Sequence, residues 1–228
     1  MPIPTYILFS YEVISGGLTN CYKSQISSLL ENGAPIDGIG VQSHFKDAEQ
    51  NVDPVQVQSK LDSLGELGLP IWVTELDIAQ WDVNSRAKHL SYFLRAAFSH
   101  ESVEGIILWG YWDQRHWRGK EASLVDGHDL KLNAAGKKYR DLIFKKWWTD
   151  EKHSTNDVNT RAFKGDYKID IIDNNGEIIE TKNINLDADK QVFFGTQEHQ
   201  PPIELKSADQ ELDEQGSGQS EDPEVEIE

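Results

Sequence analysis

The sequence predicts an α/β fold with a parallel sheet, and two observations support this. Within about the first 150 of the 228 residues, apolar strand-like runs alternate four times with segments of helical periodicity, which is typical of a parallel sheet with helices outside. After Trp148 the period changes to two, as in antiparallel strands. We therefore expect an α/β domain over residues 1–150, a small antiparallel β appendage over 151–199 and an acidic tail over 200–228.

Each strand-helix unit carries its own start and stop signals. The predicted strands lie at about 6–13, 36–42, 69–75 and 103–109, and the helices that follow them at about 20–32, 54–67, 85–99 and 134–147. Gly33 closes the first helix, and Asp53 before Pro54 opens the second as a cap and a first-turn proline. The third helix has a clear apolar stripe at helical spacing, formed by Leu90, Phe93, Leu94, Ala97 and Phe98.

The residues after the α/β region predict the appendage and the tail. Tyr167, Ile169 and Ile171 alternate with polar residues, and Asn174-Asn175-Gly176 provides a turn before another strand near 177–182. The segment from about residue 200 contains no aromatic side chain, so it cannot bury enough surface to order itself. We expect it to be disordered.

The charge of the chain excludes several classes of partner. The formal net charge is −17, and residues 201–228 contain ten Asp or Glu against the single Lys206. Such a chain repels phosphate backbones, and its Lys and Arg residues form no run, so we expect no nucleic-acid and no anionic-membrane partner. We also expect no membrane span and no signal peptide, since no apolar stretch is long enough.

Polar and aromatic residues follow the predicted strands, at the end where parallel strand-helix folds form their active sites. The second strand ends in Gln42-Ser43-His44, the third in Thr74-Glu75-Leu76-Asp77, and the fourth in Trp109-Gly110-Tyr111-Trp112-Asp113 with Trp117 close behind. Indole faces stack on pyranose rings, and amides and carboxylates bind hydroxyls, so this rim suits sugar chemistry.

Other chemistries lack their motifs. The sequence contains no glycine-rich phosphate loop, no HExxH zinc motif and no GxSxG nucleophile elbow. We therefore expect neither a metal site nor a cofactor.

At these residues the sequence resembles glycoside hydrolase family 10, the endo-β-1,4-xylanase family. The resemblance is carried by IDGIGVQSHF (36–45), LPIWVTELDI (69–78) and VEGIILWGYWDQRHW (103–117). It covers about residues 7–148 and implies a partial TIM (β/α)8 barrel containing strands five to eight only. RAFKGDYKIDI (161–171) resembles the β appendage of plant and animal members. The resemblance implies an extracellular, retaining glycoside hydrolase that cleaves internal β-1,4 linkages of xylan-type polysaccharides.

The resemblance also implies roles for individual residues. Glu75 would be the nucleophile that forms a covalent glycosyl-enzyme intermediate. His44 would contact both the nucleophile and the sugar, and Asp77 would orient its imidazole. The substrate-binding residues would be Gln42, Trp109, Trp117, Trp112 and Tyr11. For Trp112, packing is an equal alternative.

Two departures from the family pattern limit these expectations. The family's acid/base glutamate ends the fourth barrel strand, which would precede this chain. A retaining hydrolase needs two carboxyl groups about 5 to 5.5 Å apart, and the upstream candidate here, Glu12, ends the strand that corresponds to the fifth. The segment Phe9-Ser10-Tyr11-Glu12 also replaces the family's usual Asn-Asp-aromatic-Asn/Asp pattern.

We therefore expect the isolated chain to be inactive and its sheet edges to be exposed. It could pair with a separately supplied N-terminal half or with another copy. The alternative from a different class is a non-catalytic carbohydrate-binding or matrix protein derived from the same fold.

Overall fold

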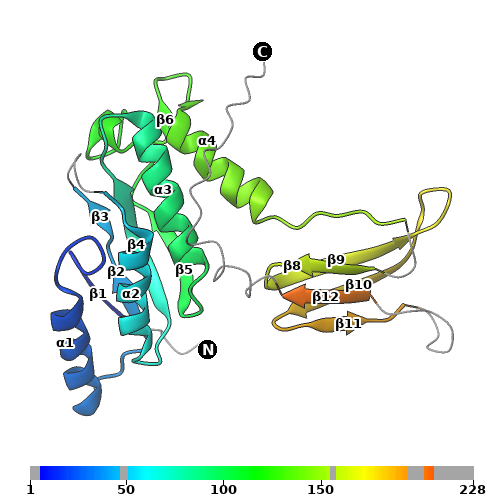
Figure 1. The fold of residues 1–228 in the computed structure, drawn as a ribbon, viewed down its shortest axis with the longest axis horizontal. Coiled ribbons are helices and arrows are strands. Elements are labelled where there is room, and N and C mark those ends of the chain that lie inside the picture. Colours follow the sequence, from blue (N-terminus) through cyan, green and yellow to red (C-terminus); the bar gives the residue numbers. More distant parts are fainter. Residues whose placement is uncertain (1–5, 47–50, 155–157, 195–202, 208–228) are drawn as a thin grey trace. The chain divides into compact units, whose positions relative to one another are not determined.

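The computed structural model describes residues 6–46, 51–154, 158–194 and 203–207 (Figure 1). The chain divides into two units, Met1–Lys145 and Lys146–Glu228. The first contains a parallel sheet with helices, as predicted, and the second contains β-strands.

Within the described residues, the main sheet of the first unit contains five strands, and all of them pair in parallel. Its strands are β1 (Ile7–Ser10), β2 (Gly38–Val41), β3 (His44–Phe45), β4 (Ile71–Ile78) and β5 (Val103–Leu108). β1 pairs with β2, β2 with β4, and β4 with β5. β3 follows β2 after a two-residue break and pairs with the last part of β4. The C-terminal ends of β3, β4 and β5 therefore lie next to one another.

The helices begin and end largely where their cap signals predict. They are α1 (Thr19–Glu31), α2 (Pro54–Gly65), α3 (Val83–Phe98), the 3-10 turn η1 (Gly119–Glu121) and α4 (Ala134–Asp141), which continues as the π turn η2 (Leu142–Lys146). The Asp53 carboxylate accepts a hydrogen bond from the Val55 N–H at 3.0 Å, so it caps α2. Gly33 follows α1 with a φ of +77°, a conformation that suits glycine.

The core of this unit lies between the sheet and α3, which packs against β4 and β5. From the predicted stripe of α3, Leu90, Phe93, Leu94 and Ala97 are buried. Phe98, the last residue of the helix, is 44% exposed.

The sheet is open at both ends within the described part of the chain. There β1 pairs with β2 alone and β5 pairs with β4 alone, so no barrel is closed. Large apolar side chains on these strands face solvent, with Phe9 59% and Ile107 49% exposed. No helix among the described residues has the length and hydropathy needed to cross a bilayer.

The described residues of the second unit form five strands. They are β8 (Asn159–Ala162), β9 (Gly165–Ile172), β10 (Ile178–Leu186), β11 (Lys190–Val192) and β12 (Ile203–Ser207). β9 and β10 form the predicted antiparallel hairpin. Its turn contains Gly176 at a φ of +87°. A small core unites the strands, with Leu186, Val192 and Phe194 among its buried members.

The prediction that the chain is disordered from residue 200 is wrong for β12. This strand pairs antiparallel with β11 and parallel with β8. Leu205 is 6% exposed and joins the core of the second unit. This buried side chain and the pairing with two neighbouring strands stabilise β12, and the composition of the segment did not predict either. The remaining tail, 208–228, lies outside the described residues.

Candidate active site

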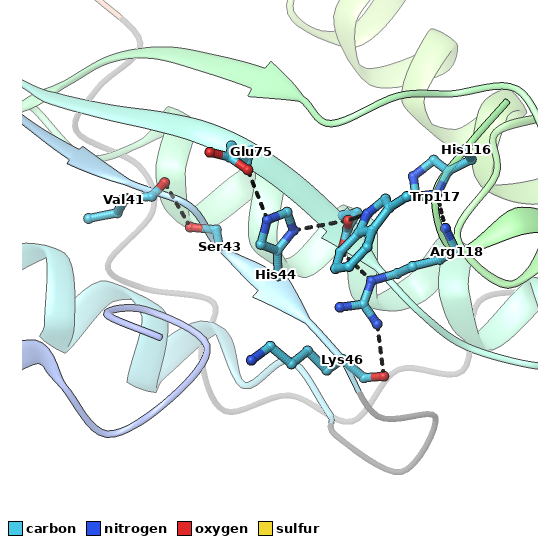
Figure 2. Close-up of polar contacts among 9 residues, drawn as sticks. Val41, Ser43, His44, Lys46, Glu75, His116, Trp117 and Arg118 are labelled. Carbon is cyan, nitrogen blue, oxygen red and sulfur yellow. Dashed lines mark hydrogen bonds and ion pairs between the residues drawn. The ribbon is translucent and has the colours of Figure 1, made fainter. Parts of the chain in front are cut away.

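A histidine bridges two carboxylates at the C-terminal end of the sheet (Figure 2). The parallel register of β3 and β4 places His44 opposite Asp77. The His44 Nε2 donates a hydrogen bond to Glu75 Oε2 at 3.1 Å, and His44 Nδ1 lies 3.0 Å from Asp77 Oδ2. The fold therefore brings together all three residues that we expected at the catalytic centre.

Two backbone irregularities present these side chains. Ser43 has a φ of +65°, which ends β2 and turns the chain so that β3 begins at His44. On the other strand, the register between β4 and β5 shifts between Val73 and Leu76. Such an irregularity re-aims the side chains within it, which here are those of Thr74 and Glu75. The Glu75 N–H donates to the Gln42 carbonyl at 3.1 Å, which ties the two irregular segments together.

The bridge is largely shielded from water. The side chains of Glu75, His44 and Asp77 are 15%, 10% and 1% exposed. Burial lowers the pKa of His44, but the hydrogen bond and charge of Asp77, followed by those of Glu75, outweigh it, so the pKa is raised from its ordinary value. The arrangement thus favours an imidazolium between two carboxylates.

Two indoles form a wall beside this bridge. The ring of Trp117 meets His44 edge-on at 5.2 Å between centroids, and that of Trp109 does so at 6.4 Å. Trp117 also donates its Nε1–H to Asp77 Oδ2 at 2.6 Å. The two indoles nevertheless remain 59% and 48% exposed, so they offer apolar faces to a ligand in solvent.

Arg118 belongs to the same cluster, although the sequence did not predict it as a site residue. Its Nε lies 3.2 Å from Asp77 Oδ1, and its guanidinium lies 4.2 Å from the centroid of the Trp117 ring. A further nitrogen donates to the Lys46 carbonyl at 3.1 Å. The available signal was a cation next to a predicted wall tryptophan, but the ion pair with Asp77 depends on tertiary structure.

Buried behind Arg118 is His116, whose Nδ1 accepts the backbone N–H of Arg118 at 3.1 Å. Burial lowers the pKa of His116, and the positive charges of Arg118 and Arg86 add to this, against an opposing effect of Asp77. His116 is thus held neutral beside the charged cluster.

The remaining predicted residues lie differently. Trp112 donates its indole N–H to the Gly127 carbonyl at 2.7 Å and packs its ring edge-on against His128, which matches the packing alternative. Gln42 joins the site through its backbone carbonyl. Tyr11 is 58% exposed beyond the end of β1.

The upstream acidic candidate is engaged elsewhere. Glu12 has a φ of +52°, and its Oε1 accepts from Lys46 Nζ at 2.5 Å. In the described ranges, no group of three or more His, Cys, Asp or Glu side chains is placed to hold a metal ion.

The chain is similar to known proteins over a part of each of those proteins. It is 39% identical over 165 residues to the anti-sigma-I factor RsgI6 of Acetivibrio thermocellus, covering 70% of this chain and 21% of that protein. It is 36% identical over 177 residues to endo-1,4-beta-xylanase 1 of Arabidopsis thaliana, covering 75% of this chain and 18% of that protein. The chain thus spans about a fifth of these relatives.

Solved structures match the fold. Xylanase 10B of Thermotoga maritima aligns with a TM-score of 0.54 at 23% identity, over 61% of this chain and 47% of that one. Xylanase 10B of Thermotoga petrophila RKU-1, solved with xylobiose, aligns with the same TM-score and identity, over 61% and 46%. The matched region thus corresponds to just under half of each of these chains.

The sequence pattern of one family covers the sheet and the candidate site together. It matches residues 9–139, which is more than half of the chain and includes His44, Glu75 and Trp117. The chain therefore belongs to glycosyl hydrolase family 10.

Proposed function

We propose that this chain carries the nucleophile half of a retaining β-1,4-xylan hydrolase, with Glu75 as the nucleophile. The observation that carries the proposal is the hydrogen bond between Glu75 and a buried imidazole that is itself paired with Asp77, next to two exposed indoles. A xylan-type substrate is supported by relatives named xylanases and by the xylanase 10B that was solved with xylobiose.

The site suits attack by a carboxylate on a sugar carbon. His44 donates one N–H to Glu75 and faces Asp77 with the other nitrogen, so the ring holds the nucleophile in one orientation. With a sugar on the indole faces, Glu75 would attack the anomeric carbon and form a glycosyl ester while the bond to the leaving oxygen breaks. Water would then cleave the ester.

The leaving oxygen must be protonated by a second carboxyl group about 5 to 5.5 Å from the nucleophile. Within the described residues, Asp77 is engaged by His44, Trp117 and Arg118, and Glu12 is paired with Lys46. We therefore propose that the acid/base lies outside this chain, in the other half of a complete barrel.

This proposal predicts a specific kinetic defect. Dinitrophenolate can leave a xylobioside without being protonated, so the full chain should release a burst of about one equivalent of it. Turnover should then be slow, because acid/base catalysis is typically worth about 10² to 10⁴-fold in rate. A stopped-flow or plate assay of absorbance measures it. Glu75→Gln should abolish the burst, whereas Glu104→Gln, at an exposed position on β5, should retain it.

The exposed indoles also suit a second function, non-catalytic binding of glycans. A folded chain that binds xylan, shows no burst and binds equally well as Glu75→Gln would favour this alternative. A burst that survives Glu75→Gln would remove Glu75 from the proposed role.

A further inference from the structure

Arg118 is fixed on three sides by the candidate site. Its Nε pairs with Asp77, its guanidinium covers the Trp117 ring, and another nitrogen donates to the Lys46 carbonyl (Figure 2). The side chain is only 14% exposed. Ordering a long arginine side chain costs rotamer entropy, so this placement needs several compensating contacts.

The charge balance of the cluster explains why a fixed cation is useful there. Asp77 is 1% exposed, and a carboxylate buried this deeply is costly unless it is paired. His44 could neutralise it only as an imidazolium, because neutral imidazole carries no charge. Arg118 supplies a positive charge at any relevant pH. Arg118 therefore gives the buried carboxylate a charged partner that does not depend on the protonation of His44.

The same contacts divide the two oxygens of Asp77. Oδ1 faces Arg118, and Oδ2 faces both His44 and the Trp117 indole N–H. With Oδ1 occupied, the carboxylate cannot rotate away from the imidazole without losing its ion pair. The position of His44 beside Glu75 then depends on Arg118 through Asp77.

We propose that Arg118 is a positioning residue of this site, which holds Asp77 aimed at His44 and thereby holds the imidazole beside Glu75. The effect of Arg118 on catalysis rests on the proposed function, whereas its effect on the position of His44 does not. The charged groups that act on the His44 imidazole are Asp77 and Glu75, and those that act on the neighbouring His116 are Asp77, Arg118, Arg86 and His44 itself.

The test is an NMR titration of the His44 imidazole in the full chain and its variants. Arg118→Met removes the charge and keeps an apolar stem over Trp117, so Asp77 is free to turn away from the imidazole. His44 then loses the carboxylate that raises its pKa, and that pKa should fall. A raised pKa of His44 would show that Arg118 acts as a repelling charge and would contradict the positioning role. The pKa of His116, which Arg118 lowers, should rise in the same variant. Arg118→Lys retains the charge and should return both values toward those of the parent.

Unchanged titration of His44 in Arg118→Met, with the Trp117 indole N–H resonance still in place, would overturn the proposal and leave Arg118 a packing role. If the Met variant does not fold, Arg118→Gln removes the same charge and can still donate to Lys46. Unfolding of both neutral variants alongside a folded Arg118→Lys would support the need for a fixed cation. A chain that shows the His44 shift but gives no dinitrophenolate burst retains the positioning role and loses the proposed hydrolase function.

Discussion

Ser43 occupies the left-handed region of backbone conformation while its side chain is fully buried. Together with Gln42 it separates β2 from β3, and His44 begins the second strand directly after it. A left-handed conformation costs a non-glycine residue about 1 to 2 kcal/mol. The surrounding packing therefore holds strain directly beside the proposed catalytic imidazole.

The strain at Ser43 predicts an asymmetric response to substitution. Ser43→Val adds a branched side chain to a buried position with a positive φ, so it should lower the free energy of unfolding by about 2 to 3 kcal/mol. Ser43→Gly is free of the φ penalty and should stay within about 1 kcal/mol of the parent. Urea unfolding measures both, and equal losses in the two variants would rule out backbone strain as the cause.

His44 and His89 should make opposite contributions to the pH dependence of stability. The pKa of His44 is raised by its carboxylates against the effect of burial, so its contribution is full below its ordinary value of 6.5 and is lost as the pH rises through the folded value. Burial lowers the pKa of His89, whose Nδ1 accepts the Val52 N–H, so its contribution is present above 6.5 and is lost as the pH falls.

These signs are measurable as differences against glutamine variants. Between pH 6 and pH 9, the stability advantage of the parent over His44→Gln should shrink. Between pH 7 and pH 5, the advantage over His89→Gln should shrink instead. The two series share one parent, so slopes of the same sign would contradict the assigned directions.

At the scale of elements, α4 depends on a close backbone approach. A Cβ at Gly136 would lie 2.1 Å from the Leu124 carbonyl oxygen, and that atom belongs to the backbone after the loop that carries Trp117. Asn133 caps the same helix by accepting the Gly136 N–H at 3.1 Å. The helix and the loop that carries Trp117 are thus joined at one tight contact.

We therefore expect Gly136→Ala to destabilise the first unit by about 2 kcal/mol or more, because backbone must move to admit a methyl group. Gly17→Ala is the matched control, since a Cβ there meets no atom within 4 Å. Thermal melts followed by circular dichroism compare the two. A Gly136→Ala variant as stable as the control would show that α4 can shift away at little cost.

Elements with local signals were predictable from the sequence, and those without were not. The cap at Asp53, the glycine after α1 and the stripe on α3 are encoded within a few residues of where they act. The break at Ser43 is a backbone conformation that a serine rarely adopts. β12 depends on β8, which lies about 40 residues earlier, and no local pattern encodes such a pairing.

At the scale of the whole molecule, the site belongs to one part of a barrel. Three neighbouring strand ends supply His44, Glu75 with Asp77, and the indole wall. The family resemblance, rather than periodicity, predicted these roles. It did not predict Arg118, because the ion pair forms only when the loop after β5 folds back on β4.

The most direct test of the account is covalent trapping of the nucleophile. A dinitrophenyl xylobioside with fluorine in place of the reacting sugar's 2-hydroxyl slows cleavage of the ester, so the glycosyl-enzyme should accumulate. Intact mass spectrometry of the full chain should show one added glycosyl group, and peptide mapping should locate it on Glu75. A folded chain that gains no mass, or that carries the sugar on another residue, would contradict the claim that Glu75 is the nucleophile.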